Sequence, residues 1–276
     1  MRLHSLSLTH FSLIHQAFTQ AFDDYLVPMR MDEEQLAAML HRRGWRPELS
    51  VGARQGDALV GLWLAGIHCD ESGPAGYCIA TGVLPAARRR GLLQAMAAAV
   101  SQRLASRGIR RQRLEVIADN AAALAAYTGL GFQAHRRLDC YRIEQAIVAP
   151  PGDWTLQHGQ PEKWPCWELD FEPAIPNSRD SLQRARPPLS LLTARRNGAL
   201  IGYALHSSAG DIAELAVRPD CRRRGVARSL LAATQAAIGA ERLGCNNIDA
   251  ADQAMANLLR GCGGQLWLSQ WEMRRA

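Results

Sequence analysis

The sequence predicts an α/β protein built from two tandem copies of one domain, each a mixed, mostly antiparallel sheet flanked by helices. The first observation is an internal repeat, in which Gly82–Val100 resembles Ala216–Thr234 and both Val83/Val217 and Gly91/Gly225 are 134 residues apart. The second is that a hairpin, a strand, a basic loop and a long helix follow one another in both copies. The third is size, because 276 residues, 47% of them hydrophobic, suffice for two ordinary domains.

A change of pattern divides the copies near Ala149–Asp153, where a proline pair and a glycine separate two patterned segments. We therefore expect an N-terminal domain at 1–148 and a C-terminal domain at 153–276. The first copy has a helical pattern at Asp32–Gly44, with Asp32 as its expected N-cap and Gly44 as its expected C-cap. The second copy has the irregular stretch Pro173–Pro188 instead, which predicts shortened N-terminal helices.

Turn dipeptides and apolar patterns place the other elements. Leu49–Ile67 predicts a hairpin that turns at Gly56-Asp57, and Leu189–Ser207 predicts one that turns at Asn197-Gly198. Further strands are expected at Tyr77–Leu84, Arg113–Ala118, Ile212–Val217 and Asn246–Ala251. The helix after the first basic loop has one apolar stripe, formed by Leu92, Leu93, Met96, Val100 and Leu104.

Cysteine spacing and hydropathy exclude several classes of protein. The number of cysteines is odd and none form a C-x-x-C pair, which favours reduced thiols over disulfides or a metal site. The N-terminal segment has too many polar breaks for a signal peptide, and no run of about 18 apolar residues predicts a membrane helix. We therefore expect a cytoplasmic protein that binds neither metal nor membrane. The cysteines are Cys69, Cys78, Cys140, Cys166, Cys221, Cys245 and Cys262.

The net charge of +6 comes almost wholly from arginine, since Lys163 is the only lysine. The guanidinium group presents a rigid fork of donors that suits phosphate. A nucleic-acid binder would combine such a charge with interleaved aromatic residues or a recognition motif, and the sequence has neither. We expect no nucleic-acid partner.

The repeated segment places three arginines and a glycine between a strand and a helix in each copy. A helix N-terminus leaves its first four N–H groups without intrahelical partners and carries a partial positive charge, so it can bind a diphosphate. Gly91 and Gly225 allow a tight turn and a close approach of phosphate to the backbone. Three arginines alone would also fit a solvated charge run, but their repetition in register favours an anion site.

This loop resembles the acetyl-CoA signature of the GNAT superfamily of N-acetyltransferases, [Q/R]-x-x-G-x-[G/A]. The second copy matches it fully, whereas Leu93 in the first copy stands where Gly or Ala is expected. This residue would either crowd the diphosphate or change how the helix begins. The resemblance covers nearly the whole chain, once per copy, and implies acetyl-CoA as a cosubstrate without a metal. It assigns cofactor binding to Val83, Arg88, Arg89, Arg90, Gly91, Leu92, Leu93 and Asn120 in the first copy, and to Val217, Arg222, Arg223, Arg224, Gly225, Val226 and Ala227 in the second.

A second block, Leu114–Phe132, is similar to the family's L-E-V-x-x-x-N-x-x-A-x-x-x-Y-x-x-x-G-F block. Acetyl transfer to an amine requires a base, an oxyanion donor and an acid for the leaving thiolate. The resemblance implies that Glu115 is the base, acting through water, that the Val83 N–H is the oxyanion donor and that Tyr127 is the acid. Taken alone, the residues also fit a solvent-facing Glu115 and a packing role for Tyr127.

The second copy departs from this block. Asn247 replaces the glutamate, Asp252 the asparagine, Leu259 the tyrosine and Gly264 the phenylalanine. Neither Asn nor Leu has a titratable group that could serve as the acid. Glu214 stands where some members of the family have a base. We therefore expect the first copy to be catalytic and the second to be able to bind CoA. The sequence leaves open whether one or both copies bind acetyl-CoA, and whether Glu115 or Glu214 is the base.

Two functions remain open from the sequence. One is an N-acetyltransferase in which a primary amine, small molecule or peptide, attacks acetyl-CoA directly in a ternary complex. The other is a non-catalytic acyl-CoA-binding sensor or scaffold. The acidic residues of Ala17–Glu34 would suit a cationic acceptor, but surface helices are commonly acidic as well. The sequence leaves open both the identity of the acceptor and whether the chain forms a homodimer. The acidic residues of this segment are Asp23, Asp24, Asp32, Glu33 and Glu34.

Overall fold

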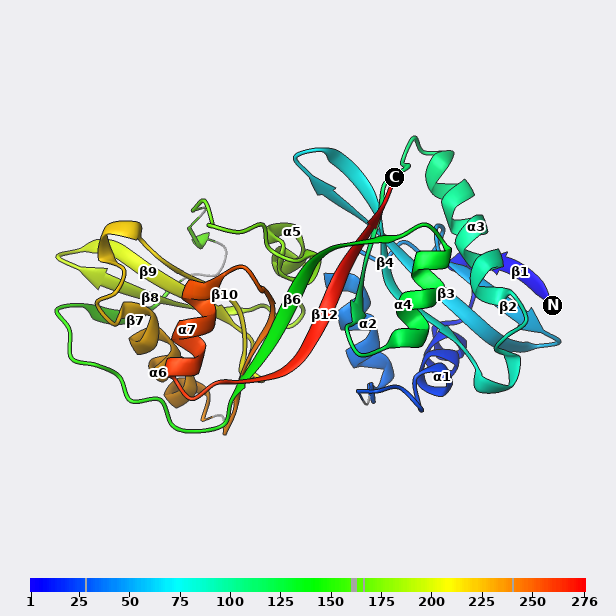
Figure 1. Ribbon diagram of the computed structural model, residues 1–276. Coiled ribbons are helices and arrows are strands. Elements are labelled where there is room, and N and C mark those ends of the chain that lie inside the picture. The colour runs from blue at the N-terminus through cyan, green and yellow to red at the C-terminus, as the bar shows by residue number, and fades with distance from the viewer. Residues whose placement is uncertain (28, 160–162, 166, 240) are drawn as a thin grey trace. The chain divides into compact units, whose positions relative to one another are not determined.

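The computed structural model describes residues 1–27, 29–159, 163–165, 167–239 and 241–276, so Cys166 lies outside the described residues. The predicted α/β class is confirmed (Figure 1). The chain forms two compact units, one of Met1–His135 with Trp271–Ala276 and one of Arg136–Gln270.

The first unit contains a sheet in the order β1-β2-β3-β4-β5, with β12 next to β5. The pair β4–β5 is parallel and the pairs from β1 to β4 are antiparallel. Its strands are β1 (Arg2–Ser5), β2 (Val51–Gln55), β3 (Ala58–Asp70), β4 (Gly73–Val83) and β5 (Gln112–Ile117), and β12 covers Gln265–Arg275. Its helices are α1 (Phe11–Ala21), α2 (Glu33–Arg42), α3 (Leu92–Ala105) and α4 (Ala121–Gly129).

The second unit has the strand order β6-β11-β10-β9-β8-β7. Here β10–β11 is the parallel pair, and the pairs β6–β11, β10–β9, β9–β8 and β8–β7 are antiparallel. Its strands are β6 (Gln133–Ile143), β7 (Thr155–His158), β8 (Ser190–Arg196), β9 (Ala199–His206), β10 (Asp211–Val217) and β11 (Leu243–Asp249). Its helices are α5 (Arg179–Gln183), α6 (Val226–Ile238) and α7 (Gln253–Gly261).

Local signals in the sequence predicted these elements well. Both hairpins turn at the predicted dipeptides, since β2 ends at Gln55 before β3 begins at Ala58, and β8 ends at Arg196 before β9 begins at Ala199. Asp32 caps α2 in a capping box with Gln35. The C-cap is Arg43 rather than Gly44, and Gly44 follows it with φ +70°. The second copy is shortened as expected, because α5 has only five residues.

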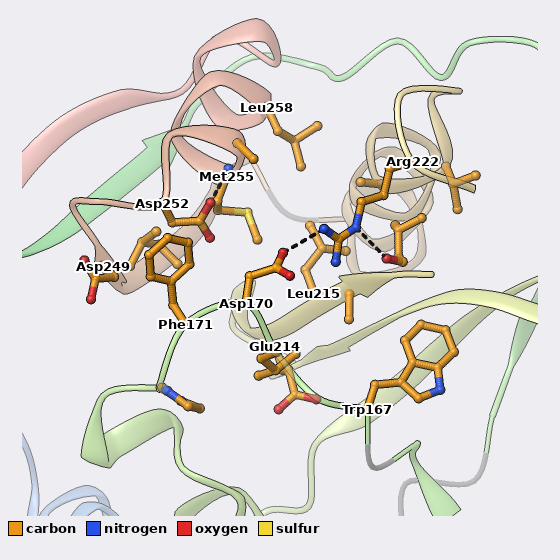
Figure 2. A pocket seen from close by; sticks show the side chains of 18 of the residues that line it. Trp167, Asp170, Phe171, Glu214, Leu215, Arg222, Asp249, Asp252, Met255 and Leu258 are labelled. Carbon is orange, nitrogen blue, oxygen red and sulfur yellow. Dashed lines mark hydrogen bonds and ion pairs between the residues drawn. The ribbon is translucent and has the colours of Figure 1, made fainter. Parts of the chain in front are cut away.

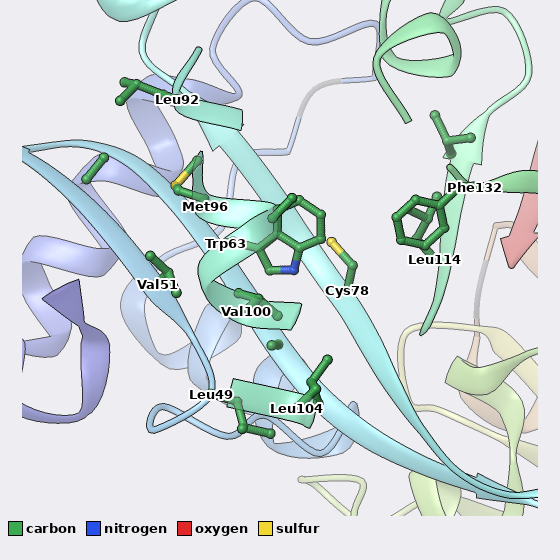
Figure 3. Packing of buried hydrophobic residues seen from close by; sticks show 14 of the residues in the cluster. Leu49, Val51, Trp63, Cys78, Leu92, Met96, Val100, Leu104, Leu114 and Phe132 are labelled. Carbon is green, nitrogen blue, oxygen red and sulfur yellow. The ribbon is translucent and has the colours of Figure 1, made fainter. Parts of the chain in front are cut away.

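The hydrophobic core of the first unit centres on Trp63 of β3, which is 1% exposed (Figure 3). The stripe of α3 packs on it, with Leu92, Met96, Val100 and Leu104 buried, while Leu93 is half-buried. Both α1 and α3 pack against β3. Since consecutive side chains of β3 are buried, the two helices cover opposite faces of the strand.

The last strand of each copy, β6 in the first and β12 in the second, runs from one compact unit into the other. The sequence did not predict this exchange. Met273 of β12 belongs to the core around Trp63, and Tyr141 of β6 belongs to a core of the second unit. The neighbouring Glu272 is fully buried and accepts a hydrogen bond from Arg113 of β5 at 2.8 Å. The boundaries of the compact units therefore differ from those of the sequence repeat. We still propose that the duplication divides the chain into 1–148 and 153–276.

Candidate active site

A gap between two parallel strands forms the centre of the first copy. The pairing of β4 with β5 ends at Cys78↔Leu114, although β4 continues to Val83 and β5 to Ile117. A bulge at Ile79 interrupts the pairing of β4 with β3. Because Leu84 N donates to Val60 O, alternation along the antiparallel pair directs the N–H of Val83 away from β3. The gap therefore faces unpaired backbone of β4.

The basic loop of the first copy leads from this strand into α3. A short 3-10 turn, Pro85–Ala87, is followed by Arg89 at φ +61° and Gly91 at φ +73°. The first helical hydrogen bond of α3 runs from Ala95 N to Gly91 O, so the preceding N–H groups have no intrahelical partner. Apart from Gly91 and its two neighbours in the chain, no described residue has an atom within 4 Å of the position that a Cβ of Gly91 would take. This open donor set fits a diphosphate.

The second copy repeats the loop geometry. The 3-10 turn is Pro219–Cys221, Arg223 has φ +61° and Gly225 has φ +95°. Its surroundings differ, however, because Pro150 Cγ lies 2.5 Å from the position of a Gly225 Cβ. The segment after β6 thus covers part of the second loop, whereas the corresponding position at Gly91 is open.

The three arginines of each loop have different environments. Arg88 Nε donates to Val83 O at 3.0 Å, and Arg222 Nε donates to Val217 O at the same distance. The first arginine therefore fastens the loop to the preceding strand. All three arginines of each loop are exposed, and those that follow the first one are Arg89 and Arg90 in the first copy and Arg223 and Arg224 in the second. Of the first helical residues, Leu92 and Val226 are buried, and Leu93 and Ala227 are half-buried.

Tyr127 lies on α4, whose N-cap is Asn120 through a bond from Ala123 N to Asn120 Oδ1 at 3.0 Å. Its ring contacts Trp63 and Phe132 edge-on, with centroid distances of 6.4 and 6.0 Å. Burial raises the pKa of the phenol well above its ordinary value, and nearby Cys78 adds to this, while a hydrogen bond with the Thr81 side chain opposes it. The phenol is therefore protonated at neutral pH, as a proton donor must be.

Glu115 is the first residue of β5 beyond the last pair with β4. Its Oε2 accepts a hydrogen bond from the Tyr77 hydroxyl at 2.5 Å. Its Oε1 is buried and has no partner among the residues that the structure describes. Burial raises the pKa of Glu115, whereas the Tyr77 hydrogen bond and the charge of Arg43 lower it. The solvent-facing alternative is therefore wrong, and Glu115 is a half-buried carboxylate with one unused oxygen.

At the positions that correspond to Tyr127 and Glu115, the second copy has Leu259 and Asn247, neither of which has a titratable side chain. Leu259 is fully buried. The side-chain oxygen of Asn247 accepts a hydrogen bond from Gln270 Nε2 at 2.7 Å. Asp252 replaces Asn120 and likewise caps its helix. Glu214 accepts a hydrogen bond from Tyr203 at 2.5 Å, and burial raises its pKa. This second phenol–carboxylate pair was not expected from the sequence.

A cavity of about 1060 Å³ opens in the second unit where β10 and β11 part (Figure 2). Their parallel pairing covers only Asp211↔Gly244 and Ile212↔Cys245. The basic loop forms one part of the wall, including Arg222 and Gly225, and Glu214 and Trp167 form another. The cavity can accept a ligand as large as a nucleotide thioester.

The acidic residues of Ala17–Glu34 do not form one free rim. Asp32 caps α2, Asp24 is paired with Arg88, and Glu33 lies 4.0 Å from His15. All five acidic residues of the segment are exposed, including Asp23 and Glu34. Three of the five acidic residues, Asp24, Asp32 and Glu33, thus have a partner within the first unit.

The model of the acetyltransferase (GNAT) family matches the chain twice, at residues 14–132 and 157–263. A mycothiol acetyltransferase of Nocardia farcinica is 38% identical over 76 residues, which are 28% of this chain and 25% of that protein. One of Amycolatopsis mediterranei is 52% identical over 60 residues, or 22% and 20%. These alignments thus span about a quarter or less of the curated relatives.

Solved structures share the fold over the whole chain. A tandem GNAT protein from the clavulanic acid biosynthesis pathway has a TM-score of 0.73 at 14% identity, covering 99% of this chain and 97% of that one. The chain belongs to the GNAT acetyltransferase family and contains two copies of its fold. Within the described residues, no helix is both long and apolar enough to cross a membrane.

Proposed function

We propose that the chain transfers an acetyl group from acetyl-CoA to a primary amine, by direct attack in a ternary complex, and that the N-terminal copy performs the reaction. The observation that carries this proposal is that both candidate groups lie where the β4–β5 pairing ends: Tyr127 interacts with Cys78 and Thr81 of β4, and Glu115 directly follows the last paired residue of β5. The second copy has Leu259 and Asn247 at these positions.

Residues of the first copy fit the cofactor. The exposed arginines and the N–H groups at Gly91, Leu92 and Leu93 would hold its diphosphate, and the N–H of Val83 faces the gap. Asn120 supports the same site by capping α4. When bound, acetyl-CoA supplies an activated thioester.

The side chains at the gap then have distinct tasks. Glu115 accepts the amine proton, directly or through a water, on the oxygen that Tyr77 does not occupy. The backbone N–H of Val83 stabilises negative charge that develops on the carbonyl oxygen. Tyr127 donates its proton to the leaving sulfur, and the raised pKa of the phenol keeps that proton in place until then.

The second copy, in this proposal, binds CoA without turnover. Its loop geometry and its cavity support binding, whereas Pro150 restricts access at Gly225. The alternative function is a non-catalytic sensor or scaffold, in which both copies bind acyl-CoA and neither transfers the acyl group.

The release of free CoA with a panel of amines separates the two functions. The panel contains polyamines, aminoglycosides, amino acids and peptides with a free N-terminus. Steady release of CoA with one class of amine supports the transferase. Tight binding of acetyl-CoA with no release for any amine supports the sensor.

A further inference from the structure

Each basic loop has an acidic partner from an earlier segment of its own copy. The Arg88 guanidinium donates to both carboxylate oxygens of Asp24, at 2.5 and 2.7 Å, and to Ala21 O at 3.3 Å. In the second copy, Arg222 Nη1 lies 2.8 Å from Asp170 Oδ2, and Figure 2 shows this pair in the wall of the cavity. The two acidic residues lie 146 positions apart, rather than the 134 that relate the arginines (170 − 24 and 222 − 88). The pairing thus occurs in both copies although the connecting segments differ.

These carboxylates meet the arginines where the loop is built to bind an anion. In both copies the Nε of the arginine is used by the strand carbonyl, so the Nη groups are the part that can reach a ligand. Those groups contact Asp24 and Asp170. Both pairs lie at the surface, since the arginine side chains are 41% exposed and the aspartates 53% and 58%. Exposed ion pairs are weak enough for a stronger anion to replace.

The segment that carries Asp24 also contacts the catalytic helix. Phe22 lies 3.2 Å from the position of a Gly82 Cβ, at the end of β4. The side chain of Tyr25 hydrogen-bonds to Asn120, the N-cap of α4. The three residues Phe22, Asp24 and Tyr25 thus contact β4, the basic loop and α4 in turn. Loss of the Arg88–Asp24 ion pair would therefore be felt, through Tyr25 and Asn120, at the helix that carries Tyr127.

We propose that Asp24 and Asp170 are internal competitors of the cofactor diphosphate for Arg88 and Arg222. A bound diphosphate takes over the Nη donors of each arginine and separates the ion pair. Each aspartate thereby lowers the affinity of its loop for anions. In the first copy, separation of the pair also removes the bond that ties the segment Phe22–Tyr25 to the basic loop. This inference rests on the proposed binding of CoA.

Calorimetric titration of the full chain with coenzyme A tests the competition. Asp24→Asn removes the charge and keeps the shape of the side chain, so CoA should bind the N-terminal copy about two- to fivefold more tightly, the range that exposed ion pairs produce. The gain should shrink at high salt, because exposed charges are screened. In an Arg88→Gln background, Asp24→Asn should have no effect, because the two residues act as a pair.

Two matched variants complete the experiment. Asp23→Asn removes the neighbouring exposed charge and should leave the affinity unchanged, and Asp170→Asn should tighten the C-terminal copy only. If the wild type binds CoA and Asp24→Asn binds it equally or more weakly, the competition is overturned while the proposed function stays intact. Absence of CoA binding by the wild type and every variant would overturn the proposed function as well.

Discussion

The Tyr77 hydroxyl donates a 2.5 Å hydrogen bond to Oε2 of Glu115, joining a fully buried residue of β4 to the first residue of β5 beyond the paired region. This bond fixes the carboxylate beside the gap and stabilises its charged form. It therefore opposes the effect of burial, which raises the pKa of Glu115. The balance between the two determines the pH at which the carboxylate can accept a proton.

The first prediction concerns the acidic limb of the pH profile. A protonated carboxyl cannot act as a base, so kcat/KM should fall as pH drops through the raised pKa of Glu115. Tyr77→Phe removes the hydrogen bond that lowers this pKa, and the limb should move to higher pH. Glu115→Gln should lower kcat by about 10²–10⁴-fold, the usual range for a lost general base.

Tyr203→Phe is the matched control for this profile, because it breaks the corresponding phenol–carboxylate bond in the second copy. It should leave the acidic limb in place. A limb that shifts with Tyr203→Phe and stays fixed with Tyr77→Phe would assign the base to Glu214.

The second prediction concerns Gly91, whose φ of +73° an L-residue adopts at a cost of about 1–2 kcal/mol. Gly91→Ala should lower the free energy of unfolding by that amount and weaken CoA binding, because its Cβ stands where a phosphate approaches. Gly108→Ala is the control, since Gly108 has φ +74° and similarly open surroundings but lies beyond the far end of α3. Equal CoA affinity of the two variants would contradict a diphosphate site at Gly91.

The third prediction concerns acid stability. The Arg111 guanidinium beside Asp70 lowers the pKa of that carboxyl from 3.8 to about 2, despite an opposing effect of burial. Because the folded-state pKa is the lower one, this stabilisation is present above about pH 4 and is lost as pH falls through about 2.

Asp70 also pairs with Arg113, which is 2% exposed. Asp70→Asn should therefore reduce the free energy of unfolding at pH 7 by about 2 kcal/mol and remove this part of the acid dependence. Urea unfolding between pH 7 and pH 2 measures both effects, with Asp23→Asn as an exposed control. An acid dependence identical to that of the wild type would show that Asp70 is not its source.

Much of the fold could be predicted because its signals are local. The turn at Asn197-Gly198 and the N-cap at Asp32 each depend on a few neighbouring residues. The repeated R-R-R-G segment likewise predicted both loops, since the φ values of Gly91 and Gly225 are intrinsic to that turn. Tyr127 and Glu115 could be named as candidates from the sequence because both stand at fixed positions within one block that resembles the family pattern.

The remaining features depend on contacts between distant parts of the chain. Nothing in the alternation of β4 distinguishes Tyr77 as the partner of Glu115, 38 residues away. The contact of Pro150 with Gly225 joins positions 75 residues apart (225 − 150). The burial of Glu272 beside Arg113 requires β12 to leave its own copy. Such pairings are decided by tertiary packing, which a pattern along the chain does not encode.

The most direct test of the account is the turnover of Tyr127→Phe with the amine that the release assay identifies. The substitution keeps the ring between Trp63 and Phe132 and removes only the hydroxyl, so the fold and the affinity for CoA should be preserved. We predict that kcat falls by about 10–10³-fold, because the leaving thiolate loses its proton donor. A kcat equal to that of the wild type would contradict catalysis by Tyr127 in the N-terminal copy.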